Sequence, residues 1–243
     1  MKNKKLIHGD CLDKKVLDQI EIKADIVFTS PPYNLGKGGD FYREKFHKGD
    51  ERQKTKKYKT LEADKNKDWG NWIIEFVKTY LDKAEYVFLN LQKLSSNKKD
   101  IHKILYKLND YFCDEIIWNK SMGIPCGFQD RIMTSTHETI YIFSKKPTRK
   151  IGTKYWKGNK NSCVSIGGNR KSEYAKLHKA VMGQDFSDYI IDNFVKDDGV
   201  VIDPMMGLGT TGVSCMKYGK KFIGIEIEKD YLEIARKRLE EVK

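Results

Sequence analysis

Short, continuous apolar runs alternate with amphipathic segments from residue 24 to the end of the chain. Runs such as "DIVF" and "YVFL" lack the polar alternation of a half-exposed strand, so they indicate strands that are buried on both faces. Helices between such strands are typical of an α/β fold with a mostly parallel, twisted sheet and a helical layer on each side. The pattern predicts strands at 24–29, 86–91, 114–119, 138–143, 199–203 and 221–226, and helices at 69–84 (with Asp68 as N-cap), 97–109, 184–195, 210–218 and 229–242.

Length and composition indicate a globular protein. The chain has 243 residues, which suits one α/β domain with inserted loops. No run of about 18 apolar residues occurs, and the basic start, "MKNKKLIHGD", lacks the apolar stretch of a secretory signal. The five cysteines are scattered without a C-x-x-C pair, which predicts neither a disulfide framework nor a zinc site. We therefore expect a cytoplasmic protein with no membrane association and no metal.

The net charge of +12 is concentrated in one part of the chain. Residues 144–180 contain eleven Lys and Arg and a single acid, for a local charge of +10. Tyr155, Trp156 and Tyr174 are interleaved with these cations, as on surfaces that bind a polyanion. The alternative is a lysine-rich loop that is merely solvated. A second Lys-rich stretch, 37–68, has little apolar periodicity and is predicted to be a long mobile loop.

The strand at 24–29 ends in "TSPPYN", where two prolines follow closely on an apolar run. Proline has no N–H group and a fixed φ, so neither Pro31 nor Pro32 can continue a sheet ladder. A stiff turn would then hold Ser30 and Tyr33 at the carboxyl end of the strand. Such turns also simply stop strands, and these six residues alone do not decide between a stop and a site.

A second turn at a strand end, "DPMMGLGTTG" (203–212), contains three glycines in the spacing G-x-G-x-x-G. Glycines let the backbone approach a ligand closely, and the following helix start offers free N–H groups. The next strand ends at Glu226, whose carboxylate can accept both hydroxyls of a ribose. The spacing matches the dinucleotide fingerprint, but only 31 residues follow Gly212, too few for a second nucleotide-binding half. A single nucleoside-like ligand fits better.

Together these motifs resemble those of the DNA methyltransferases that methylate exocyclic amino groups. "DPMMGLGTT" followed by "FIGIEIEKDYLEIARKRL" is similar to their S-adenosylmethionine site, and "TSPPYN" is similar to their catalytic motif, (D/N/S)-P-P-(Y/F). "HGDCL" (8–12) resembles the segment that binds the adenine of the cofactor. "HKAVMGQDF" (178–186) resembles a helix-start motif of the family, which usually has proline where Gly183 stands. The resemblance extends over almost the whole chain, and the motif order is that of the permuted β class.

The resemblance implies a Rossmann-like methyltransferase fold and assigns roles to particular residues. The catalytic residues that it implies are Ser30, Pro31, Pro32 and Tyr33. The Ser30 Oγ atom and the Pro31 carbonyl would accept hydrogen bonds from the target amino group, and Tyr33 would offer its ring to a base flipped out of the duplex. The cofactor-binding residues that it implies are Asp10, Cys11, His178, Asp203, Met205, Gly207, Gly209, Thr210, Thr211 and Glu226. The DNA-binding candidates are Lys37, Lys154, Trp156, Lys157, Lys160 and Arg170.

Two further features suggest different chemistry. Cys126 follows Pro125, like the nucleophile of methyltransferases that attack carbon 5 of cytosine, but those enzymes lack the S-P-P-Y motif. We interpret Cys126 as a loop cysteine near the DNA. His137 and Glu138 are adjacent and could suggest metal or acid–base chemistry. We interpret that pair as structural, or as contacting the DNA backbone.

The predicted function is methyl transfer from S-adenosylmethionine to an exocyclic amino group in double-stranded DNA, within a restriction–modification or epigenetic system. One catalytic domain would span 1–243, with a long loop at 36–68 and a basic DNA-recognising segment at 144–180. Serine before P-P-Y goes more often with cytosine N4 in this family and aspartate with adenine N6, so we predict cytosine N4, with adenine N6 as the alternative. A non-catalytic nucleic-acid-binding protein on the same fold, or an RNA or protein methyltransferase, would be a competing function. A homodimer is compatible with the sequence.

Overall fold

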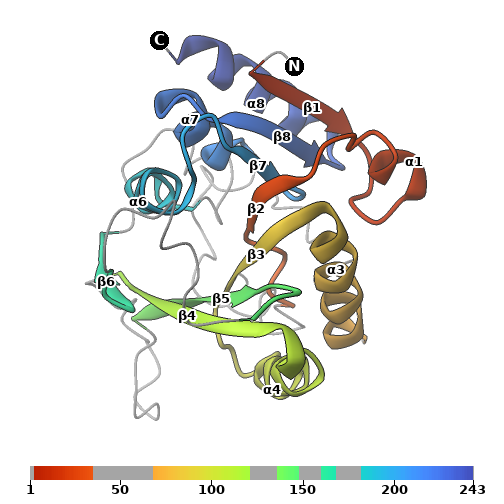
Figure 1. Ribbon diagram of the computed structural model, residues 1–243, viewed down its shortest axis with the longest axis vertical. Helices are drawn as coiled ribbons and strands as arrows, with labels where there is room; N and C mark the ends of the chain where they lie inside the picture. Colours follow the sequence, from red (N-terminus) through yellow and green to blue (C-terminus); the bar gives the residue numbers. More distant parts are fainter. Residues whose placement is uncertain (1–2, 35–67, 121–135, 148–159, 168–181, 243) are drawn as a thin grey trace, which may run out of the picture.

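The described strands of this protein form one eight-stranded sheet. A computed structural model describes residues 3–34, 68–120, 136–147, 160–167 and 182–242. The order across the sheet is β1-β8-β7-β2-β3-β5-β4-β6 (Figure 1). The bounds are β1 Lys4–His8, β2 Ala24–Thr29, β3 Ala84–Leu91, β4 Phe112–Asn119, β5 His137–Phe143, β6 Cys163–Ser165, β7 Val200–Asp203 and β8 Lys221–Glu226.

The sheet is mostly parallel, as the sequence predicts. β1, β8, β7, β2 and β3 run in the same direction. β5 is antiparallel to both of its neighbours, β3 and β4, whereas β4 and β6 are parallel to each other. Because β5 is reversed, it begins at the edge where the parallel strands end. Its first residues therefore join the carboxyl ends of the other strands.

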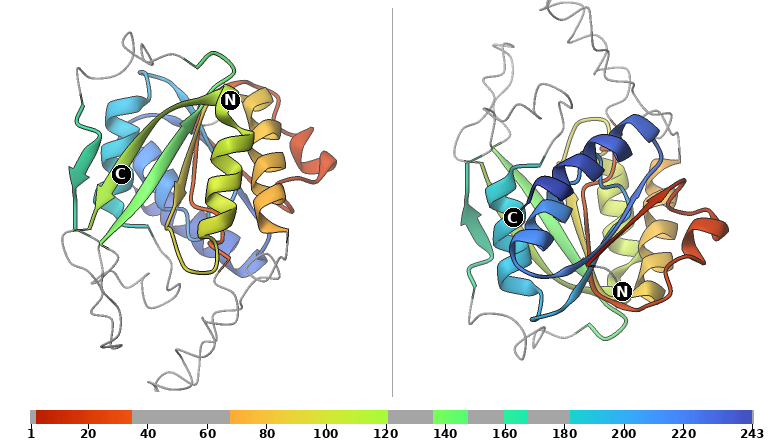
Figure 2. Two further views of the ribbon diagram at one scale, coloured as in Figure 1. Left: turned by 90° about the horizontal axis from the view of Figure 1, so that it is seen from below. Right: turned by 90° about the horizontal axis from the view of Figure 1, so that it is seen from above.

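Helices cover both faces of the sheet, and Figure 2 shows the two layers from opposite sides. One layer contains α1 (Lys14–Leu17), α3 (Trp69–Lys83), α4 (Lys98–Lys107) and the 3₁₀ turn η3 (Asn109–Tyr111). The other contains α6 (Gln184–Phe194), α7 (Thr210–Lys217) and α8 (Lys229–Glu241). Within the described ranges, none of these helices has the length and apolar character that a membrane crossing requires.

Each face of the sheet has its own apolar core. Val27 of β2 packs with the α3 side, and Ile26 and Phe28 pack with the α6 side. Neighbouring residues of one strand point to opposite faces, so a strand that is covered on both sides must be apolar at every position. This explains why the run "DIVF" shows no polar alternation.

The predicted elements are confirmed within two residues at their ends, and those at 24–29 and 221–226 have the predicted bounds. The structure adds β1, α1 and β6, which were not predicted as elements. β6 has only three residues, and its pairing with β4 decides that it is a strand. Asp68 precedes α3 as predicted, but its carboxylate accepts from the Asn71 side chain (2.7 Å) and forms no side-chain cap to the backbone.

Candidate active site

The carboxyl ends of the strands bring predicted site residues to one edge of the sheet. Asp203 and Glu226 end β7 and β8, Asp10 comes shortly after β1, and Ser30 directly follows β2. Ligands of open α/β sheets bind at this edge. Two groups of side chains lie there, one around Glu226 and one around Ser30.

Glu226 is a buried carboxylate, 6% exposed, at the last position of β8. Its Oε2 atom accepts from the Gly207 N–H (2.8 Å) and its Oε1 atom from the Glu228 N–H (2.9 Å). Burial raises the pKa of Glu226 above its ordinary value, and these backbone N–H groups partly oppose that shift. A carboxylate oxygen has two lone-pair sites, so the side chain is held in place and can still accept from two hydroxyls.

The glycine turn between β7 and α7 is shaped by two residues in the left-handed region. Gly207 and Gly209 have φ angles of 51° and 79°, which favour glycine. A Cβ at Gly209 would lie 2.9 Å from Leu239 of α8, whereas no described atom lies within 4 Å of a Cβ at Gly207. Arg238 of α8 donates to the Leu208 carbonyl (2.7 Å) and fixes the turn. At Gly209, glycine is therefore required by the close approach of α8. At Gly207, the space around the missing side chain is open, and a ligand could approach the backbone there.

Asp203 links the two groups of side chains. It is 4% exposed, and its Oδ1 atom accepts from the Thr29 hydroxyl (2.8 Å) and the Met205 N–H (3.2 Å). Burial raises the pKa of Asp203 to about 6, and hydrogen bonds, the first of them from Thr211, oppose that shift. Thr29 immediately precedes Ser30, so this hydrogen bond ties the end of β2 to the glycine turn.

Asp10 and Cys11 lie beside the end of β8. The Gly9 N–H donates to the Glu226 carbonyl (3.0 Å), which brings the two segments together. Asp10 is exposed, and its Oδ1 atom accepts from the Leu12 N–H (2.8 Å). Cys11 is buried, and burial raises the pKa of its thiol well above the ordinary value. Cys11 therefore behaves as an apolar side chain, and its carbonyl accepts from the Tyr80 hydroxyl (2.8 Å).

Neighbouring carbonyl groups of the "SPPY" turn differ in their partners. The Pro32 carbonyl accepts from Trp69 Nε1 (2.8 Å), and the Tyr33 carbonyl accepts from Asn97 Nδ2 (2.7 Å). Among the described residues, the Pro31 carbonyl has no hydrogen-bond partner. The turn is thus anchored from both sides, and one carbonyl keeps its capacity to accept.

A polar cluster lies against this turn; we call it the Glu138 cluster, and its members are Ser30, Tyr33, Asn90, Lys120 and Glu138. The Ser30 and Tyr33 hydroxyls are 2.7 Å apart, and the Tyr33 hydroxyl donates to Glu138 Oε2 (2.9 Å). Asn90 Nδ2 donates to the same Oε2 atom (2.6 Å), and Lys120 forms an ion pair with Oε1. Burial, and then the charge of Glu138, raise the pKa of Tyr33 well above its ordinary value, so this hydroxyl keeps its proton.

The position of Glu138 favours the structural alternative of the two interpretations given for the His137–Glu138 pair. Glu138 is 8% exposed and accepts a hydrogen bond from Tyr33 of the "SPPY" turn, whereas His137 is exposed. Sequence reasoning also missed Asn90 and Lys120. A signal was present, because Asn90 interrupts the apolar run "YVFLNL" near its end and Lys120 directly follows "DEIIWN". Polar residues at the ends of neighbouring buried strands meet at one edge.

Several predicted residues lie outside the described residues. The described part of the basic segment includes Lys160, which is exposed. The predicted residues that fall outside are Lys37, Cys126, Lys154, Trp156, Lys157, Arg170 and His178.

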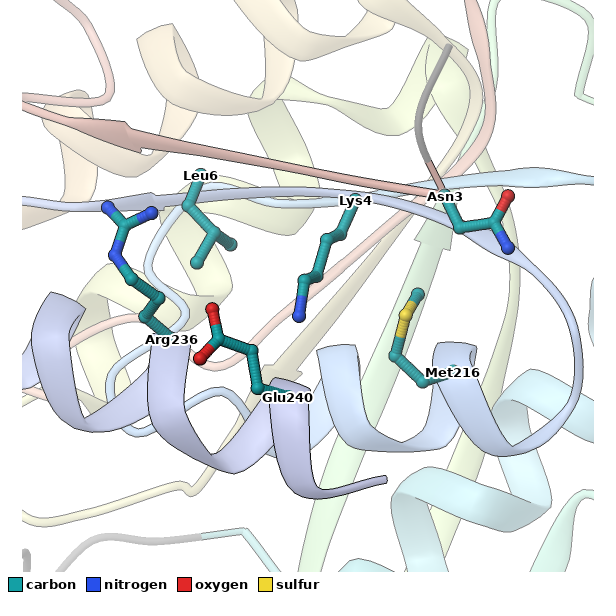
Figure 3. A pocket seen from close by; sticks show the side chains of 6 residues that line it. All are labelled: Asn3, Lys4, Leu6, Met216, Arg236 and Glu240. Carbon is teal, nitrogen blue, oxygen red and sulfur yellow. The ribbon is translucent and has the colours of Figure 1, made fainter. Parts of the chain in front are cut away.

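A cavity of about 400 Å³ lies against β1, α7 and α8, and Figure 3 shows the side chains that line it. It is formed by the start of β1 and by residues near the ends of α7 and α8, and its lining residues are Asn3, Lys4, Leu6, Met216, Arg236 and Glu240. None of the predicted site residues lines this cavity. It is therefore separate from the candidate active site.

Comparison with known proteins assigns the chain to a family. Residues 24–237 match the family model N6_N4_Mtase, described as DNA methylase. The match covers most of the chain, so this protein belongs to the DNA methylases that modify amino groups. The predicted resemblance is confirmed, and the protein is an enzyme of this class.

Curated relatives are type II methyltransferases. M.HinfI of Haemophilus influenzae is 26% identical, over 98% of this chain and 68% of its own. M2.LlaDCHI of Lactococcus lactis subsp. cremoris is 28% identical, over 96% of this chain and 88% of its own.

Solved structures confirm the Rossmann-like methyltransferase fold. The PvuII DNA methyltransferase (cytosine-N4-specific) has a TM-score of 0.71 at 19% identity, over 98% of this chain and 86% of its own. M1.HpyAVI, solved as a complex with SAM, has a TM-score of 0.64 at 21% identity, over 97% of this chain and 98% of its own.

Proposed function

We propose that this DNA methylase transfers a methyl group from S-adenosylmethionine to an exocyclic amino group of a base in double-stranded DNA. The observation that carries the proposal is the Thr29–Asp203 hydrogen bond. Thr29 precedes Ser30 of the Glu138 cluster, and Asp203 begins the glycine turn whose Gly207 is bonded to Glu226, so the bond holds the two groups of side chains next to each other. A cofactor bound by the residues around Glu226 would therefore lie beside a base held at the Glu138 cluster. When bound, S-adenosylmethionine supplies an electrophilic methyl group, so orientation of the two reactants supplies much of the rate.

The residues around Glu226 fit this cofactor. Both carboxylate oxygens of Glu226 are oriented by backbone N–H groups, and two fixed acceptors suit the two hydroxyls of a ribose. Asp10 is exposed and follows Gly9, which is hydrogen-bonded to the Glu226 backbone, so Asp10 can accept from an adenine amino group. The open space at Gly207 leaves room for the methionine part. The other residues assigned to that part are Asp203, Met205, Gly209, Thr210 and Thr211.

The "SPPY" turn suits a reaction at an amino group. The lone pair of such a nitrogen is delocalised into the ring, so the nitrogen is a poor nucleophile. Two acceptors on its N–H groups would draw it toward tetrahedral geometry as the methyl arrives. Ser30 Oγ and the Pro31 carbonyl, which has no partner among the described residues, are those acceptors. Preorganised acceptors of this kind need no rearrangement at the moment of reaction.

Tyr33 is assigned to the base itself. An amino group inside a duplex cannot reach the cofactor, so the target base must leave the stack. Tyr33 is held at its hydroxyl by Glu138 and at its carbonyl by Asn97. Its ring is therefore fixed and offers a stacking face for the flipped base.

We propose cytosine N4 as the target atom, with adenine N6 as the alternative. The support is Ser30, because serine in this position of the motif goes more often with cytosine in the family. Ser30 and aspartate can both accept one N–H, so pocket size must also contribute to the choice.

The basic segment 144–180 is assigned to DNA. Its cations would contact phosphates, which fix the register of the duplex without reading its sequence. Lys154, Lys157 and Lys160 are the residues to test.

Product analysis tests the proposed function. The protein is incubated with DNA and S-adenosylmethionine that carries a labelled methyl group, and the DNA is digested to nucleosides for mass spectrometry. We expect N4-methylcytosine. N6-methyladenine alone would reject the cytosine assignment and keep the rest, whereas 5-methylcytosine would reject the mechanism and return attention to Cys126. No labelled nucleoside in DNA would favour the competing functions, namely a non-catalytic nucleic-acid-binding protein or a methyltransferase of RNA or protein.

A further inference from the structure

Glu138 is a buried carboxylate to which the proposed chemistry gives no role. Three neighbours from other segments face it: Tyr33 from the turn after β2, Asn90 from β3 and Lys120 from the residue after β4. Such a buried carboxylate is costly unless it is paired and hydrogen-bonded, and Glu138 is both. Because Glu138 contacts the "SPPY" turn, we ask what role its carboxylate has in the proposed reaction.

The hydrogen bonds of the Glu138 cluster have one possible direction. An ionised carboxylate only accepts and a lysine ammonium only donates, so Tyr33 must give its proton to the bond with Glu138. The Tyr33 oxygen can then accept, and the Ser30 hydroxyl, 2.7 Å away, is the donor. Ser30 Oγ also accepts from Asn90 Nδ2 (3.3 Å), and its second lone pair is left for the amino group of the base.

Methyl transfer to an amino group leaves one proton too many. The nitrogen gains a fourth bond, and the positive charge that leaves the sulfur appears on the nitrogen. One N–H proton must then depart to restore the conjugated amine. Ser30 Oγ accepts one of those N–H bonds in the proposed function, so it is the first atom that this proton can reach.

We infer that Glu138 is the terminal acceptor of this proton, through a relay from Ser30 to Tyr33 to Glu138. The inference rests on the proposed function. As the nitrogen–methyl bond forms and the sulfur–methyl bond breaks, the amino proton passes to Ser30 Oγ. The Ser30 proton passes to the Tyr33 oxygen, and the Tyr33 proton passes to Glu138 Oε2. Ser30 and Tyr33 end as they began, Glu138 becomes neutral, and no other reactant is required.

The other members of the cluster support this assignment. Tyr33 is partly buried, and desolvation of its hydroxyl, followed by the charge of Glu138, holds its pKa well above the ordinary value. It therefore does not remain as a phenolate and passes a proton on. Asn90 donates to both Tyr33 (2.9 Å) and Glu138 (2.6 Å) and keeps the two oxygens in place. Lys120 forms an ion pair with Glu138 Oε1 and stabilises the ionised Glu138 before the reaction.

Single-turnover kinetics on the full chain test the relay, with DNA and S-adenosylmethionine both saturating. Glu138→Gln keeps the size of the side chain but cannot take a proton, and Tyr33→Phe keeps the ring but interrupts the relay. We expect each to slow methyl transfer by about 10²-fold to 10⁴-fold, the usual contribution of a positioned base. Calorimetric affinity for S-adenosylmethionine should stay within about threefold of the wild type in both, because neither residue belongs to the group around Glu226.

The pH dependence separates a proton acceptor from a structural residue. Besides Glu138, the titratable groups of the cluster are Tyr33 and Lys120, and neither loses its charge state on acidification. The pH–rate profiles of the wild type and of Glu138→Gln should differ, because the amide of the variant cannot take up a proton. Glu115→Gln, the same substitution at an exposed site of β4, is the matched control and should follow the wild type.

A double variant removes the remaining alternative. If Glu138 served only as the counter-ion of Lys120, then Glu138→Gln combined with Lys120→Met would recover the wild-type rate, and this result would overturn the relay. We expect the double variant to stay slow. Wild-type-like transfer by Glu138→Gln would also reject the relay and leave the proposed function intact. Wild type and Glu115→Gln that bind the cofactor but methylate no DNA amino group would reject the proposed function itself.

Discussion

Replacing Asp203 by asparagine should change how the stability of the protein depends on pH. The pKa of Asp203 is raised from 3.8 to about 6, so the folded chain holds this proton more tightly than the unfolded chain. The stabilisation by that proton is complete below pH 3.8 and is lost as the pH rises through 6. A shift of about two units corresponds to about 3 kcal/mol in total, of which about 1.5 kcal/mol is lost between about pH 5 and pH 8. Asparagine does not titrate, so Asp203→Asn should lack this loss.

Urea unfolding of the wild type and the variant at several pH values between about 5 and 8 measures this difference. We expect the free energy of unfolding of the wild type to fall relative to Asp203→Asn as the pH rises. Thr29→Val provides a second comparison, because it removes a hydrogen bond that lowers the pKa of Asp203. The free energy of unfolding of Thr29→Val should therefore fall more steeply between about pH 5 and pH 8 than that of the wild type. Stability curves that stay parallel for wild type and Asp203→Asn would refute the reasoning.

Three further changes test other parts of the site. Glu226→Ala removes the acceptor assigned to the ribose and should weaken S-adenosylmethionine about 30-fold, or about 2 kcal/mol, by calorimetry; unchanged affinity in a folded variant would remove Glu226 from the site. Gly209→Ala forces alanine into a φ of 79° against α8, and the free energy of unfolding in urea should fall by about 2 kcal/mol; an unchanged value would show that the turn relaxes. Replacing Lys154, Lys157 and Lys160 with Gln should reduce the slope of log affinity for DNA against log salt by about 2 to 3, and an unchanged slope would mean that the segment is only solvated.

Local sequence patterns are sufficient to locate most of the candidate site. The prolines of "TSPPYN" restrict their own backbone, and the glycines of "GLGTTG" permit positive φ angles that other residues disfavour, so both turns can be located from the residues themselves. Apolar runs likewise locate strands, because a strand covered on both faces has no polar position. The placement of Ser30, Asp203 and Glu226 at strand ends needs nothing more. The short β1, α1 and β6 are not predicted, since segments of three to five residues have too few positions to show a period.

The sequence by itself thus determined the fold class, the family resemblance and the two turns, because each depends on residues that are near one another in the chain. Only the tertiary structure decided how the Glu138 cluster assembles. Tyr33 and Glu138 are 105 positions apart, and Asn90 and Glu138 are 48 apart. Their contact depends on the strand order β2-β3-β5-β4 and on the reversal of β5. Long-range packing selects that order, and a short apolar run has the same sequence pattern whichever strand lies beside it and whichever way it points.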